Sequence, residues 1–124
     1  MSTDIEKREL YRAIAEMAYV IAKADHGLSA EERMAFRTII QEELDYDSWA
    51  AQSRFELLDE ITEPSIEKVY NEAIHDFRLH KRVFNEELKE KALRVVKRVA
   101  DACNGFSDKE AFIMDRFRHD LNNL

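Results

Sequence analysis

The chain contains only two glycines, one proline and one cysteine among its 124 residues. Tight turns depend on glycine and proline, so their scarcity argues against a many-stranded sheet and favours long helices joined at few corners. The single cysteine, Cys103, excludes an internal disulfide and is compatible with a reducing compartment. No segment approaches the roughly 20 apolar residues of a membrane span, and the charged N-terminus lacks a signal-peptide pattern. We therefore expect a cytoplasmic protein that does not insert into membranes.

Motifs of common catalytic sites are also missing. The sequence has no glycine-rich phosphate loop, no nucleophile elbow and no zinc-spaced set of Cys and His. Cys103 has no motif around it that would activate a thiol. Glu72-x-x-His75 is one step of a di-iron motif, but such sites need a second step, which is absent. We expect a protein that is not an enzyme and needs no cofactor, with a divalent cation as the one open possibility.

Apolar residues at helical spacing account for almost all of the chain. Six helices are predicted: from about Asp4 to Lys23, after Ser29, from Asp47 or Ser48, after Thr62, after Asn85 and after Ser107. Their inner stripes include Leu10, Ile14, Met17, Ala18 and Ile21; Phe36, Ile39, Ile40 and Leu44; Trp49, Phe55, Leu58 and Ile61; Ile66, Val69, Tyr70, Ala73, Ile74 and Phe77; Leu88, Ala92, Val95, Val96, Val99 and Cys103; and Ile113, Phe117 and Leu121. The sequence therefore predicts an all-α, single-domain bundle of about six helices over residues 1–124.

Polar residues on these helices suggest local pairs. On the outer face of the fifth helix, Glu87 precedes Lys91 and Glu90 precedes Arg94 by four residues, the favourable orientation for an ion pair. On the fourth helix, Glu72, Asp76 and His80 recur every four residues and so share a face. Such spacing is common on solvated helices, and we assign it no metal.

Both glycines lie in one motif that occurs twice. Ala-x-x-Gly-(apolar)-Ser-x-x-Glu is found at residues 24–32 and again 78 positions later, at 102–110. Glycine past a helix end provides a positive φ, and serine with glutamate three residues on forms a capping box for the next helix. A pair of well-made helix corners explains the whole motif.

Carboxylates also crowd these two corners, which leaves a second interpretation open. If the two repeats pack about a pseudo-twofold axis, oxygen ligands from both corners suit a hard cation. The candidate metal ligands are Asp25, Glu32, Asp101 and Glu110. The twelve-residue ligand pattern of an EF-hand is missing.

The repeated corner resembles that of the TerB-like family, which includes the tellurite-resistance protein TerB. The matching residues are Gly27, Leu28, Ser29 and Glu32 in the first corner and Gly105, Phe106, Ser107 and Glu110 in the second. The resemblance spans the chain and implies a bacterial helical module acting in stress or tellurite-type resistance. The family's acidic residue before glycine is replaced by His26 and Asn104. If that acid is a cation ligand, these changes weaken the site.

Charge is distributed unevenly. Residues 1–64 hold 15 acidic and seven basic residues, a net charge of −8, whereas residues 65–124 carry +1. An acidic half disfavours nucleic acid as a partner and suits a basic protein surface. The acids are densest where large aromatics also occur, and Trp and Tyr are enriched at binding hot spots. We therefore predict an unidentified protein partner that contacts Glu42, Glu43, Asp45, Tyr46, Asp47 and Trp49. The oligomeric state does not follow from the sequence.

Overall fold

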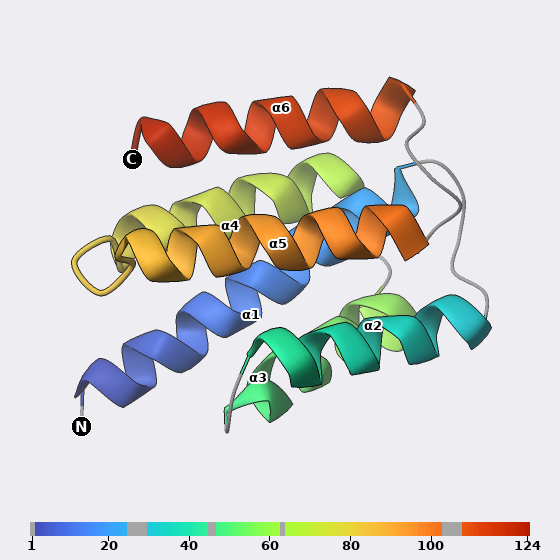
Figure 1. Cartoon of the computed structure of the whole chain (residues 1–124), viewed down its shortest axis with the longest axis horizontal. Helices are drawn as coiled ribbons and strands as arrows, with labels where there is room; N and C mark the ends of the chain where they lie inside the picture. Colours follow the sequence, from blue (N-terminus) through green and yellow to red (C-terminus); the bar gives the residue numbers. More distant parts are fainter. Residues whose placement is uncertain (1, 25–29, 45–46, 63, 103–107) are drawn as a thin grey trace.

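The computed structural model of the chain describes residues 2–24, 30–44, 47–62, 64–102 and 108–124. Within these ranges the chain forms six α-helices and one short π-helical segment, and no strand (Figure 1). The elements are α1 (Ser2–Lys23), α2 (Ala30–Glu43), α3 (Ser48–Glu56), η1 (Leu57–Thr62), α4 (Ile66–Leu79), α5 (Glu86–Ala102) and α6 (Asp108–Asn122). The prediction of an all-α bundle of six helices is confirmed.

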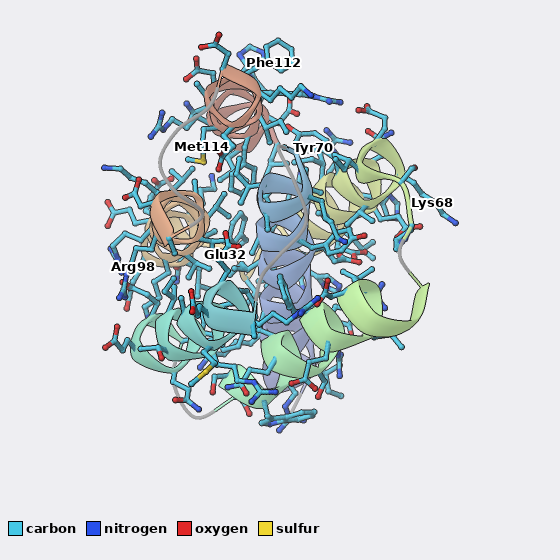
Figure 2. All side chains as sticks on the ribbon, turned by 90° about the vertical axis from the view of Figure 1, so that its right-hand side faces the viewer. Glu32, Lys68, Tyr70, Arg98, Phe112 and Met114 are labelled. Carbon is cyan, nitrogen blue, oxygen red and sulfur yellow. The ribbon has the colours of Figure 1, made fainter. Side chains whose placement is uncertain are left out.

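Helix α1 is the centre of the bundle rather than one of its outer helices. It contacts α3, η1, α4, α5 and α6, and Figure 2 shows it surrounded by the other helices. From Ala13 to Ala22 every side chain is buried, on all sides of the helix. The predicted stripe is therefore only part of its buried surface. A helix enclosed by neighbours is typically apolar all round, and Glu16 is the one charged residue between Ala13 and Ala22. The alanines in this stretch leave room for the neighbouring helices.

The outer helices bury the stripes that the sequence indicates. The predicted apolar residues of α2, α4 and α5 are buried within the described residues, with Ile66 only partly covered. The ring of Phe77 on α4 stacks on Phe84, in the connection between α4 and α5, at 4.7 Å between centroids. It lies 5.8 Å from the ring of Phe117 on α6. Figure 1 shows α6 as an outermost layer beside α4 and α5, with α2 and α3 on the opposite side of the molecule.

The N-terminal cap of α5 is the predicted residue, whereas that of α4 is a different one. The side chain of Asn85 accepts a hydrogen bond from the backbone N–H of Leu88 at 2.9 Å, so it caps α5 as predicted. Helix α4, however, is capped by Ser65, which accepts from the N–H of Lys68 at 3.3 Å. Thr62 is not the cap, because it still belongs to the π-helical segment η1. Pro64 therefore precedes the helix instead of opening its first turn.

The repeated corners lie mostly outside the described residues. This applies to Gly27, Leu28 and Ser29 in the first corner, and to Cys103, Gly105, Phe106 and Ser107 at the second. The helices that follow them begin at Ala30 and Asp108, directly after the two serines, as predicted.

Candidate functional site

A groove of about 450 Å³ lies between α1, α4 and α6. Ligand sites are typically hollows of about 300–1,000 Å³ with a mainly apolar lining and a few polar groups. This groove has that character, because its apolar side chains come from three helices and its charged side chains come from α4 and α6. The lining residues are Val20, Ala24, Ile66, Glu67, Tyr70, Asp108, Lys109, Phe112, Ile113 and Arg116.

Helix α6 contributes half of this lining because it carries two stripes. Glu110, Met114, Phe117 and Leu121 face the core. A second stripe on the flank contains Lys109, Phe112, Ile113 and Arg116, spaced three and four residues apart. Phe112 is 68% exposed and stands on the outer side of α6 (Figure 2). Ile113 was predicted on the inner stripe with Phe117 and Leu121, but it is only partly buried and lines the groove instead. The 109–112–113–116 spacing was a signal for this second stripe.

One wall of the groove is fixed by a polar network between α4 and α6. The Arg116 guanidinium lies 3.9 Å from the centroid of the Tyr70 ring and donates hydrogen bonds of 3.1 and 2.9 Å to the two oxygens of Glu67. The Tyr70 hydroxyl donates to Asp120 at 2.5 Å. Burial and the bond to Asp120 raise the pKa of Tyr70, so this hydroxyl stays protonated and keeps donating.

The predicted acidic surface is largely engaged in ion pairs within the molecule. Glu43 accepts from Arg94 at 2.9 Å and from Arg98 at 3.1 Å, and Glu42 accepts from Arg98 at 2.6 Å. Burial by itself would raise the pKa of Glu43, but the hydrogen bonds from both arginines outweigh it and lower that pKa. These bonds connect α2 to α5.

The remaining residues of that surface differ in their burial. Asp47 is buried and accepts from Arg8 at 3.3 Å, while Asp45 and Tyr46 lie outside the described residues. Trp49 does not lie on the inner face of α3: it is 50% exposed, and the Arg8 guanidinium is 5.6 Å from its ring. The reason is that Ala50, Ala51 and Phe55 occupy the buried face of α3. Trp49 is therefore open to a partner.

Phe55 is part of the core, as its place on the predicted inner stripe of the third helix indicates. It is buried, its ring stacks on Phe36 at 3.8 Å between centroids, and Tyr19 meets its edge at 6.4 Å. This aromatic cluster joins α1, α2 and α3, which explains why the acidic segment contains a phenylalanine at this position.

The predicted corner ligands are differently exposed. Glu32 is half-buried in the first turn of α2, Asp101 is exposed near the end of α5, and Glu110 is 1% exposed in the first turn of α6. Figure 2 shows Glu32 between α2, α5 and α1. Asp25 lies outside the described residues. Among the residues that are described, no group of three His, Cys, Asp or Glu side chains is placed to hold a metal ion.

Comparison of the chain with protein-family models, with curated proteins and with solved structures gives no match. None of the described helices combines the length and the apolar character that crossing a membrane requires.

Proposed function

We propose that the chain is a non-enzymatic helical interaction module that holds an amphipathic helix of a partner protein in the groove between α1, α4 and α6. The observation that carries this proposal is the apolar groove with Phe112 at 68% exposure beside it. Contiguous exposed apolar patches on soluble proteins commonly mark sites of interaction with proteins or ligands. Aromatic side chains of this kind act as anchors in protein interfaces.

The shape and charge of the groove favour a helix as the occupant. Its α6 wall runs from Asp108 to Arg116, about two helical turns. A partner helix presents apolar side chains at the same three- and four-residue spacing. Charged side chains of both signs line the groove beside the apolar ones. Glu67 and Arg116 are bonded to each other, and Asp108 and Lys109 add one charge of each sign. Such a mixed rim suits the mixed polar face of an amphipathic helix and sets its orientation.

The TerB-like corner motifs provide the biological context of the proposal. They support a cytoplasmic module in a bacterial stress or tellurite-type resistance response. The exposed Trp49 remains a second predicted contact with a partner, whereas Glu42, Glu43 and Asp47 of the predicted surface are engaged by arginines of the same molecule. The alternative function, a divalent-cation sensor at the corners, has no comparable support in the described geometry.

The test compares three forms of the protein as bait: the wild type, Phe112→Asp in the groove and Leu79→Asp as a control. Leu79 is 64% exposed and does not line the groove, so the control adds the same charge to an exposed apolar site elsewhere. We expect one partner to be retained by the wild type and Leu79→Asp and lost from Phe112→Asp. Calorimetry with the purified partner should then show at least tenfold weaker binding to Phe112→Asp, about 1.4 kcal/mol. Equal affinities for all three forms would contradict the proposal.

A further inference from the structure

A second cavity, of about 470 Å³, differs from the groove because each of its lining residues has a polar or charged side chain. It lies between α1, α3 and α4, and none of its residues belongs to the groove. Its lining residues are Glu16, Arg54, Asn71, Glu72, His75 and Asp76. The proposed binding of a partner helix does not involve this cavity, and the charged residues of the cavity point to a different ligand.

Glu16 is the most buried member of the set, with 1% of its surface exposed. Its Oε2 atom accepts two hydrogen bonds from Arg54, at 3.1 Å from Nε and 2.8 Å from Nη2. Its Oε1 atom is buried as well, but no donor within the described residues reaches it. A buried carboxylate oxygen without a donor is costly, and a ligand that donated a hydrogen bond to Oε1 would remove this cost.

The mouth of the cavity adds further negative charge. Glu72 and Asp76 are one turn apart on α4, and both line the cavity that Glu16 lines from α1. Among the described residues of the lining, Arg54 is the only Lys or Arg, and with it the three carboxylates give a net charge of −2 when all are ionised. These side chains share a cavity, yet no three metal-ligating groups among the described residues are placed around one metal position. A longer cation with charges at separated points fits this arrangement better.

We propose that this cavity binds an aliphatic diamine or polyamine, with one ammonium group donating to Glu16 and the other held by Glu72 and Asp76. An ammonium group has three donors and no acceptor, which suits an oxygen that lacks a donor. Two ammonium groups carry the +2 charge that balances the cavity. The methylene chain between them would lie between Glu16, which is buried, and Glu72, which is exposed.

The ionisation of Glu16 makes this binding depend on pH. Burial raises the pKa of Glu16 to about 7, Arg54 opposes this, and Asp76 and Glu72 add to it. Burial also raises the pKa of Asp76, which is faced by Glu9, His75, His80 and Arg54. A bound ammonium group favours the ionised carboxylates. Binding should therefore release protons near neutral pH and become tighter as the pH rises from 6 to 8.

The experiment measures thermal unfolding of the full chain with putrescine as the probe. Butylamine, which has one ammonium group, and sodium chloride at equal ionic strength are the ligand controls. A ligand that binds only the folded form raises the unfolding midpoint. We expect a saturable rise with putrescine that exceeds both controls and is larger at pH 8 than at pH 6.

Two variants and a matched control locate the site. Glu72→Gln and Asp76→Asn remove one charge each at the mouth, and Glu90→Gln removes one charge on an exposed position of α5. Calorimetry should show at least tenfold weaker putrescine binding in each mouth variant and unchanged binding in Glu90→Gln. The proposal is overturned if putrescine acts no differently from salt, or if Glu72→Gln, whose exposed side chain is not needed for folding, binds putrescine as the wild type does.

Discussion

At the scale of single residues, Glu16 makes the stability of the fold depend on pH. Because the pKa of Glu16 is raised to about 7, the folded state binds more protons than the unfolded state between about pH 4.5 and pH 7. The free energy of unfolding should therefore decrease as the pH rises through this window, by an amount on the order of 3 kcal/mol. Chemical denaturation at a series of pH values measures this slope.

Replacement of Glu16 by Gln tests the assignment of that slope. We expect Glu16→Gln to flatten the dependence between about pH 4.5 and pH 7, and Glu90→Gln, on the exposed face of α5, to leave it unchanged. Asp76, whose pKa burial also raises, contributes a remainder of the same sign. A wild-type slope that persists in full in Glu16→Gln would show that other groups cause it.

Trp49 gives a second prediction at this scale. Because half of its surface is exposed and the core contacts of α3 come from other residues, Trp49→Ala should lower the free energy of unfolding by less than about 1 kcal/mol. The buried Phe55 provides the contrast, since Phe55→Ala should cost about 3–5 kcal/mol. If Trp49 binds the partner, Trp49→Ala should mainly speed dissociation, measured by surface plasmon resonance. A large loss of stability in Trp49→Ala would contradict this division.

At the scale of helices, the cap of α5 should contribute measurably to stability. The Asn85 side chain accepts from the N–H of Leu88 at 2.9 Å, and the loss of such a cap typically costs about 0.5–2 kcal/mol. We expect a decrease in this range for Asn85→Ala and a much smaller one for Asn85→Asp, which keeps an acceptor oxygen. Urea denaturation checks both. Equal losses in the two variants would mean that the hydrogen bond is not the cause.

The ion pairs between α2 and α5 predict a difference between two neighbouring acids. The Glu43 side chain is mostly covered and bonded to two arginines, whereas Glu42 is exposed and bonded to one. Glu43→Gln should therefore cost about 1–2 kcal/mol and Glu42→Gln less than about 1 kcal/mol. Because the pKa of Glu43 is lowered, its contribution is present above the unfolded pKa and lost as the pH falls through the folded value. Equal effects of the two substitutions at pH 7 would argue against this difference.

At the scale of the whole molecule, the predicted cation site would join the first repeated corner to the second. A cation held by Asp25, Glu32, Asp101 and Glu110 and bound only by the folded form must raise the unfolding midpoint. The site predicts a saturable rise with millimolar calcium or magnesium, and a weaker one in Asp101→Asn, which changes only an exposed side chain. A scanning calorimeter measures both. Unchanged midpoints in the presence of either metal would contradict the site.

The sequence by itself determined the helices and most of their inner faces. The stripes of α2, α4 and α5, the cap at Asn85 and the starts of α2 and α6 all follow from local spacing and local hydrogen bonding. Such features depend on residues within about one or two turns of each other, which a single sequence displays directly. For the same reason the Glu87–Lys91 pair could be read from the sequence, and it is present at 3.8 Å.

Only the tertiary structure decided what lies between the elements. Arg94 bonds to Glu43 on α2, although Glu90 lies one turn away on its own helix. Helix α1 is enclosed on all sides, and Glu16 on it shares a cavity with Glu72 and Asp76 on α4. The groove likewise needs α1, α4 and α6 together. These contacts join residues about 40 or more positions apart, and their geometry depends on how helices pack, which no local spacing specifies.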